Sequence, residues 1–181
     1  WLPSGTITYQ FDNGLQLRAS ASKTIARPQF RELLLQTYTD PATLRSFVGN
    51  PALQDSTLIN GEVRAEYYFG QNSRVSLAGF YKEIDNPIEA YSQFTDNAQS
   101  TSFANAPSAQ LYGGEFEFVW NYDLIDLGGF FESKRALLIA NYTYTQSELQ
   151  VEPGDQTFIF ITGVGASPRD ASGLFRDGDP L

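Results

Sequence analysis

A regular alternation of apolar and polar side chains runs through residues 58–84 and is interrupted once, by the turn-forming residues 70–73. Successive side chains of a strand point to opposite faces of a sheet. One face therefore carries an apolar set: Gly61, Val63, Ala65, Tyr67 and Phe69 before the turn, and Val75, Leu77, Gly79 and Tyr81 after it. The other face carries Glu62, Arg64, Glu66 and Lys82. The alternation predicts a hairpin of two long strands with one dry and one wet face.

The same alternation appears in four further segments, residues 5–11, 15–24, 111–122 and 136–145. Asp12-Asn13-Gly14 between the first two is a strong hairpin-turn signal. Most of these segments run for about ten residues, which is the length a tilted transmembrane strand needs. Strands of soluble proteins are more often about five or six residues long. We expect an all-β, antiparallel up-and-down meander of about six long strands.

The connections between these segments are of unequal length. The connections after the first, third and fifth segments are the shorter ones. Two long connections follow the second and fourth segments, at residues 25–57 and 85–110, and a third long stretch opens at Gln146. Every long loop therefore leaves the same rim of the sheet. Outer-membrane barrels show this asymmetry, with short periplasmic turns and long extracellular loops.

Aromatic side chains mark both ends of the predicted apolar face. Those at the short-turn end are Tyr9, Phe11, Tyr67, Phe69, Trp120 and Tyr122, and those at the long-loop end are Tyr81, Tyr112 and Tyr144. Two aromatic belts around an apolar band are typical of the two membrane interfaces. Alternation alone is equally compatible with a soluble sandwich that has these rings in its core. Strand length, loop asymmetry and ring placement together favour the membrane barrel.

Composition excludes several function classes. The formal net charge of −9 argues against a nucleic-acid partner, which needs a basic surface. The chain has no cysteine and no histidine, so thiolate metal sites are impossible and the commonest zinc ligand and general base are missing. We therefore expect no metal and no cofactor. Any catalysis would have to rest on carboxylates, hydroxyls, lysine or tyrosine, and we expect transport and not catalysis. Neither Trp1 nor Leu181 carries a terminal signal, and we expect an internal segment of a longer chain.

The long loops carry weaker signals of local order. Short helical turns are predicted near residues 28–35 and, after Asp40, near residues 41–48. Residues 156–162 are β-prone, whereas residues 163–181 have the composition of a loop. Three Asn- and Pro-containing triplets mark turns: Gly49-Asn50-Pro51, Asp85-Asn86-Pro87 and Asn105-Ala106-Pro107.

Charged side chains on the polar face allow two interpretations. Glu115 and Glu117 share a face about 7 Å apart, which would suit a soluble all-β carbohydrate-active enzyme. That enzyme requires the two glutamates in a concave cleft and Phe116, Phe118 and Trp120 buried in a core. Barrel interiors are routinely polar, so hydrated wall charges are the favoured interpretation. Arg18 and Glu66 lie at similar depth on neighbouring predicted strands and are expected to form a salt bridge.

The loop rim supplies the candidate ligand contacts. They are Arg27, Phe30 and Arg31 after the second strand, and Tyr91 and Phe94 on the next long loop. The guanidinium groups suit an anionic ligand and the rings offer stacking surfaces. For Arg27 a loop-anchoring role is favoured, because the following proline restricts it. The other two long loops are mainly acidic, which disfavours a strongly anionic ferric siderophore and leans toward a neutral ligand such as an oligosaccharide.

Several ordered blocks resemble the barrel of TonB-dependent outer-membrane receptors. They are Leu-Pro-Ser at 2–4, Leu-Arg-Ala-Ser at 17–20, Ser-Lys-Thr-Ile-Ala-Arg-Pro-Gln-Phe at 22–30, Gly-Asn-Pro-Ala-Leu at 49–53, the run at 76–89, Asn-Ala-Pro at 105–107 and Leu-Tyr-Gly-Gly-Glu-Phe-Glu at 111–117. The resemblance implies a large barrel closed around an N-terminal plug in the outer membrane of a Gram-negative bacterium. Such plugged transporters have about 22 strands, so six strands are a sector of one.

The resemblance also implies a transport function and a set of partners. We expect energised uptake of a scarce solute, a ferric siderophore or an oligosaccharide, in contact with membrane lipid and lipopolysaccharide. The TonB complex would act through an N-terminal part of a longer chain, because residues 1–181 show no plug, no TonB box and no closing strand. Residues 1–181 are therefore interpreted as a partial barrel domain. A plug-less porin-type barrel is the remaining alternative, and the presence of a plug would distinguish the two.

Overall fold

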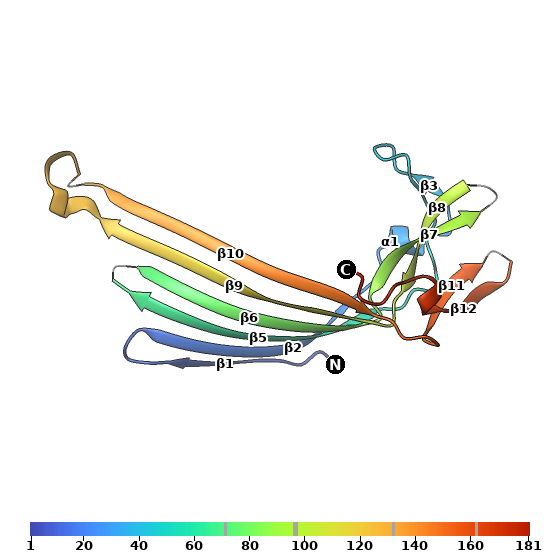
Figure 1. The fold of residues 1–181 in the computed structure, drawn as a ribbon, viewed down its shortest axis with the longest axis horizontal. Coiled ribbons are helices and arrows are strands. Elements are labelled where there is room, and N and C mark those ends of the chain that lie inside the picture. Colours follow the sequence, from blue (N-terminus) through green and yellow to red (C-terminus); the bar gives the residue numbers. More distant parts are fainter. Residues whose placement is uncertain (71, 96–97, 132, 162) are drawn as a thin grey trace.

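Antiparallel strands dominate the computed structural model, which describes residues 1–70, 72–95, 98–131, 133–161 and 163–181, without the side chains of residues 94–95, 98 and 126–127. Six of the strands form one sheet in the order β1-β2-β5-β6-β9-β10. Figure 1 shows this sheet as a long curved ribbon with short turns at one end and folded loops at the other. The strands are β1 (Ser4–Gln10), β2 (Leu15–Ala26), β5 (Ser56–Phe69), β6 (Ser73–Asp85), β9 (Ser108–Asp123) and β10 (Arg135–Gln150).

The predicted six-stranded meander is confirmed, and the strands are mostly longer than the alternation indicated. β5, β6, β9 and β10 have 14, 13, 16 and 16 residues. In the described part of the chain β1 and β10 each have one neighbour in this sheet, so the sheet is open and does not close into a barrel.

The register of the sheet keeps the apolar side chains together on one face. Ala65 lies opposite Leu77, Leu77 opposite Phe116, and Phe116 opposite Tyr142. A slip of one residue in any pair would move a whole strand's apolar set to the other face. None of the described residues covers this face: Leu77 is 63% exposed and Tyr142 66%. Such a face fits lipid, whereas the soluble-enzyme alternative requires it to be a core.

The short turns depend on local backbone geometry. Gly14 closes the first turn at φ +85°, and its carbonyl accepts the Tyr68 N–H at 2.9 Å. A Cβ atom at position 14 would lie 2.5 Å from the Tyr68 carbonyl oxygen, so only glycine fits there. The third short connection contains two 3-10 turns, η1 (Leu124–Leu127) and η2 (Gly129–Phe131). None of the helices in the described residues is long and apolar enough to cross a membrane.

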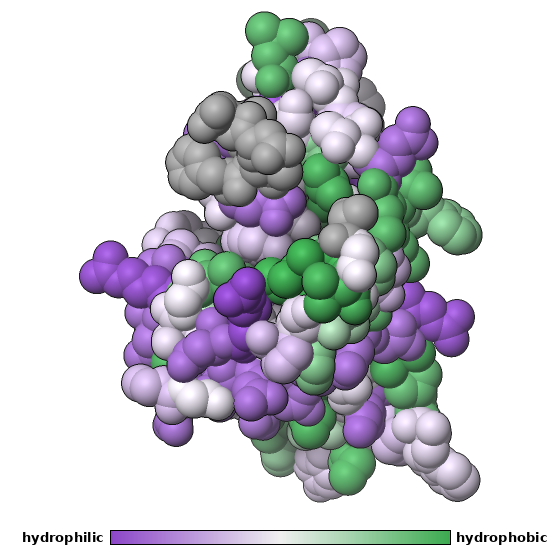
Figure 2. Space-filling view, turned by 90° about the vertical axis from the view of Figure 1, so that its right-hand side faces the viewer, coloured by the Kyte–Doolittle hydropathy of each residue, from purple (hydrophilic) through white to green (hydrophobic). Residues whose placement is uncertain are grey.

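At the other end of the sheet the long loops fold together into what we call the loop cap, residues 27–55, 86–107 and 151–181. It contains α1 (Phe30–Leu33) and the sheet β3-β4-β8-β7, formed by β3 (Tyr38–Thr39), β4 (Ser46–Phe47), β8 (Ala98–Asn105) and β7 (Ile88–Thr95). The hairpin of β11 (Gln156–Ile161) and β12 (Gly165–Asp170) and the turn η3 (Ala171–Gly173) complete it. Viewed from this end, hydrophilic and hydrophobic residues are intermixed over the surface (Figure 2).

Four loop predictions can be compared with the structure. The helical turn near residues 28–35 is present as α1, and the β-prone stretch near residues 156–162 is present as β11. The capped helical turn predicted near residues 41–48 is present but shorter than expected: a single turn, closed by the Leu44 N–H on the Asp40 carbonyl at 2.8 Å, leads into β4. Leu44 has φ +57°, which ends any helix there. The loop prediction for residues 163–181 is wrong, because β12 lies within them.

The buried core of the chain lies in and beneath the loop cap, not in the sheet. Its members come from the second and third long connections and the adjoining ends of β9 and β10: Tyr91, Ala104, Ala106, Ala109, Leu149, Val151, Ala171 and Phe175. The small alanines let backbones of different loops approach closely. The second and third long loops are therefore packed together and are not independent of each other.

Candidate functional site

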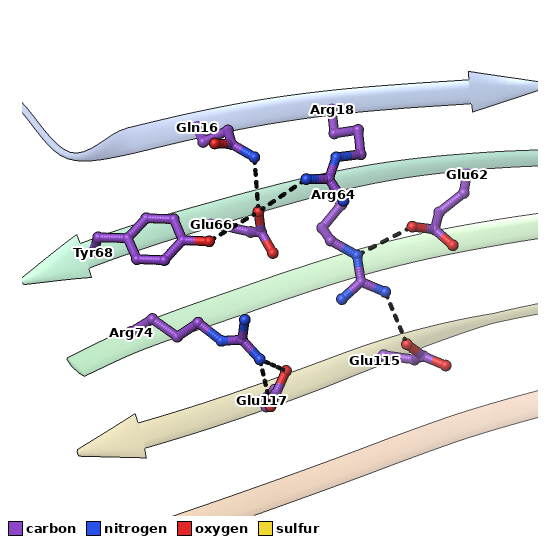
Figure 3. Close-up of polar contacts among 9 residues, drawn as sticks. All are labelled: Gln16, Arg18, Glu62, Arg64, Glu66, Tyr68, Arg74, Glu115 and Glu117. Carbon is purple, nitrogen blue, oxygen red and sulfur yellow. Dashed lines mark hydrogen bonds and ion pairs between the residues drawn. The ribbon is translucent and has the colours of Figure 1, made fainter. Parts of the chain in front are cut away.

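The polar face of the sheet is a wall of paired charges, shown in Figure 3. Glu66 is its most buried member, at 5% exposure. The Gln16 amide donates to its carboxylate at 3.0 Å, the Tyr68 hydroxyl lies at 3.4 Å and the Arg18 guanidinium at 3.8 Å. The predicted Arg18–Glu66 salt bridge is confirmed. A carboxylate this buried needs several donors, and β2 and β5 supply them.

Arg64 lies at the centre of the wall. It faces Arg18 directly in the register of β2 and β5, a placement that is unfavourable for like charges. Carboxylates on both sides offset the repulsion: Arg64 Nε donates to Glu62 at 3.1 Å and Nη2 donates to Glu115 at 3.2 Å. The Arg64 guanidinium on β5 therefore reaches over β6 and binds Glu115 on β9.

Arg74 and Glu117 form the closest pair among the residues labelled in Figure 3. One Arg74 nitrogen, Nη2, lies 2.8 Å from both carboxylate oxygens of Glu117. Arg74 Nε is buried and has no hydrogen-bond partner among the described residues. Glu115 and Glu117 are thus each paired with an arginine, as wall charges of a polar barrel interior would be. Trp120 on the opposite face is 37% exposed, which also argues against the buried aromatic core of the enzyme alternative.

Asn50 joins the three long connections of the loop cap. Its side chain is 1% exposed, and Nδ2 donates to the carbonyls of Phe103 at 2.9 Å and Phe158 at 2.8 Å. Oδ1 accepts the Ala52 N–H at 2.9 Å. One side chain from the first loop therefore fixes β8 of the second loop and β11 of the third.

Asn105, the last residue of β8, also joins separate loops through its side-chain amide. Its Oδ1 accepts the Gln54 N–H at 2.8 Å, and its Nδ2 donates to the Asn86 carbonyl at 2.8 Å. The Thr157 hydroxyl donates to the Asn105 carbonyl at 2.7 Å. The sequence marks these asparagines only as turn formers. Their role as clamps was missed, although the recurrence of Asn within two residues of Pro in all three triplets was a usable signal.

The candidate ligand contacts on the rim fall into different environments. Arg27 pairs with Asp55 at 3.6 Å, which is consistent with loop anchoring. Phe30 is 95% exposed on α1, and Arg31 beside it is also exposed. Tyr91 is 8% exposed and packs edge-to-face on Phe175 in the cap core.

The structure therefore does not bring the five candidates together. Phe30 and Arg31 form an open surface. The burial of Tyr91 raises the pKa of its hydroxyl and leaves no free ring face for a ligand. The side chain of Phe94 lies outside the described residues. Within the described residues, no cluster of three or more carboxylates is arranged to hold a metal ion.

Comparison with known proteins gives one family. A family model described as TonB dependent receptor-like, beta-barrel, matches residues 1–176. This span includes all six long strands and nearly all of the loop cap. The comparison with curated proteins gives no match.

Proposed function

The chain belongs to the family of TonB-dependent receptor β-barrels, and from this premise we propose that its six strands and loop cap form one sector of a plugged outer-membrane transporter. The family carries out TonB-dependent transport across the outer membrane of Gram-negative bacteria and is not a family of enzymes. Plugged transporters have about 22 strands. The open edges of β1 and β10 leave room for the strands that would continue the wall on both sides.

The observation that carries the proposal is the two-faced sheet. One face is apolar, exposed and bounded by aromatic rings, as a surface in contact with lipid should be. The other face holds the ion pairs of Glu66, Arg64 and Glu117, as expected of a hydrated interior beside a plug. The loop cap lies at one end of this wall, where a ligand arriving from outside would first be met.

The solute is proposed to be of the oligosaccharide class. The loop cap is rich in Asp and Glu, so a polyanionic ferric siderophore would be repelled. Phe30 and Arg31 are the exposed rim residues proposed to meet the ligand. Lipopolysaccharide would surround the cap, and divalent cations between its phosphates and the acidic side chains would bridge the two.

Spin-label accessibility in the full-length receptor, reconstituted in bilayers, tests the membrane assignment. Labels at Leu77, Phe118 and Ala140 should be relaxed by a lipid-soluble quencher such as oxygen. Labels on the opposite face, at Glu66, Glu117 and Thr143, should not. Shielding of the first set from both lipid and water would show a protein core and overturn the proposal.

Energised uptake is tested separately in cells. A strain that expresses the receptor should accumulate a labelled oligosaccharide only when its TonB is functional. Equal uptake with and without TonB would indicate a passive porin-type barrel.

A further inference from the structure

A groove of about 1020 Å³ crosses the apolar face of the sheet on the side of the loop cap. Its lining comes from all six long strands and is almost entirely apolar. The smallest residues form its floor. Gly5 on β1 lies opposite Ala21 on β2, and Ala21 lies opposite Gly61 on β5. Gly79 continues this floor on β6, so the hollow follows a run of positions with little or no side chain.

The fold itself does not require glycine at three of these positions. A Cβ atom would meet nothing within 4 Å at Gly5, and it would come no closer than 4.0 Å to another atom at Gly61 and 3.9 Å at Gly79. Each lies in a regular run of strand pairs and has no positive φ. Glycine inside a strand weakens it and often marks a place where another molecule approaches closely. The missing side chains therefore keep the groove open.

Three tyrosines border the groove toward the loop cap. Tyr81 on β6 lies opposite Tyr112 on β9, and Tyr144 lies on β10. The Tyr144 hydroxyl donates to Gln146 Oε1 at 3.2 Å, and the Tyr112 hydroxyl donates to Glu148 Oε1 at 3.5 Å. Both acceptors lie farther along β10 toward the cap, so the polar ends of these rings face the cap and their apolar parts border the groove. Tyrosine takes this orientation at the boundary between headgroups and hydrocarbon.

The lining and the length of the groove indicate what fills it. Water would find few hydrogen-bond partners there, and an empty groove would forfeit dispersion contacts, so hydrocarbon is the fitting occupant. From β1 to β9 the groove crosses four inter-strand steps, roughly 19 Å at about 4.8 Å each. One leaflet is about 15 Å deep, half of a hydrocarbon core of about 30 Å. The groove is therefore long enough for one extended acyl chain.

We propose that this groove holds one acyl chain of a lipopolysaccharide molecule, whose polar part lies beyond the tyrosine border. The inference rests on the proposed outer-membrane function and names a specific lipid partner for its apolar face. The groove lies on the side of the loop cap, which is the outer side of the proposed barrel, and lipopolysaccharide is the lipid of that leaflet. The surrounding hydrocarbon is equally apolar, so the preference comes from close packing in a rigid groove.

Native mass spectrometry of the full-length receptor in detergent tests this inference. The probes are lipid A, which is the acylated anchor of lipopolysaccharide, and palmitoyl-oleoyl phosphatidylethanolamine. The parent should retain one lipid A molecule at concentrations at which it retains no phosphatidylethanolamine. Gly61→Leu and Ala21→Leu fill the groove and should weaken lipid A binding by about tenfold or more, because the chain would lose on the order of ten atomic contacts.

Ala65→Leu is the matched control. It makes the same change as Ala21→Leu on the same face, opposite Leu77 and outside the groove. It should bind lipid A within about twofold of the parent, since no contact with the chain is lost. Without lipid A, Gly61→Leu should melt no lower than the parent, because its Cβ comes no closer than 4.0 Å to another atom. Added lipid A should raise the melting temperature of the parent and of Ala65→Leu more than that of the two groove variants.

Four results would overturn the inference. They are undiminished lipid A binding in Gly61→Leu and Ala21→Leu, an equal loss of binding in Ala65→Leu, equal retention of phosphatidylethanolamine, and a parent receptor that retains no lipid A. Failure of the membrane assignment is a separate result, because it shows as apolar-face spin labels shielded from lipid. Failure of the transport function shows as TonB-independent uptake.

Discussion

Replacing Asn50 by alanine tests whether the three long loops form one body. The substitution removes three hydrogen bonds: two from Nδ2 to the carbonyls of Phe103 and Phe158, and one to Oδ1 from the Ala52 N–H. Water cannot replace them without opening the cap, because the side chain is 1% exposed. At about 1 kcal/mol net for each bond, the cap should lose about 3 kcal/mol.

Hydrogen–deuterium exchange measures this loss where it occurs. An opening free energy lower by about 3 kcal/mol speeds exchange by about 100-fold, since 1.4 kcal/mol is a factor of ten. The increase should appear in peptides from β8 and β11, which are remote from Asn50 in sequence. Peptides from β5 and β6 in the same sample should be unchanged, because the sheet does not depend on this clamp.

Two further variants sharpen the result. Asn50→Asp keeps the oxygen that accepts the Ala52 N–H, but it replaces the Nδ2 donor with a second oxygen that faces the Phe103 and Phe158 carbonyls. At neutral pH this variant should speed exchange in the cap at least as much as Asn50→Ala does. Asn141→Ala makes the same truncation at an exposed position on β10 and should have no effect. Exchange in β8 and β11 within about twofold of the parent would refute the idea of a single clamped cap.

Two other perturbations follow from particular contacts. Gly113→Ala should lower the free energy of unfolding of the receptor by about 1–3 kcal/mol, because the new Cβ would meet the Tyr144 carbonyl oxygen and lie 2.6 Å from the Phe80 ring. Gly114→Ala is the matched control, since its Cβ would lie 3.4 Å from the nearest atom, the Ala78 carbonyl oxygen. Equal melting temperatures for the two variants would contradict the reasoning. Burial raises the pKa of the Glu89 carboxyl group above 4.5. The folded state therefore binds the carboxyl proton more tightly than the unfolded state does. The contribution of Glu89 to stability consequently falls as the pH rises from about 4.5 through the raised pKa. Glu89→Gln should therefore be more stable than the parent at pH 7 and equal to it near pH 4, and a less stable variant at pH 7 would exclude this account.

The strands and their faces were predictable because their signal is local and repeated. Period-2 alternation over ten or more residues determines which side chains share a face, and the turn formers at Gly14 and Gly70 set the points where the chain reverses. The Arg18–Glu66 pair follows from these two facts alone. What the alternation underestimated was length, because the ends of β9 and β10 continue beyond the apolar band toward the cap.

The loop cap was not predictable in the same way, because its contacts join residues far apart in the chain. Asp40 gave a genuine capping signal, yet the chain leaves the turn at Leu44 and enters β4, where Phe47 stacks between rings of two other strands. Tertiary packing there overrides local propensity. β12 was hidden by Pro168, a residue that normally argues against a strand and is tolerated here in a two-stranded hairpin.

The clamp at Asn50 has a consequence for the order in which the molecule is assembled. Each long strand pairs with the next long strand along the chain, so the wall can grow by successive hairpins. Asn50, in contrast, finds its second acceptor 108 residues later, at Phe158. Closing so large a loop is costly in chain entropy, and the contact forms only after the intervening strands are in place. We expect a nascent receptor to carry a protease-sensitive, half-built cap until β11 arrives, and the appearance of protease resistance in the cap then reports that this part of the barrel has been inserted.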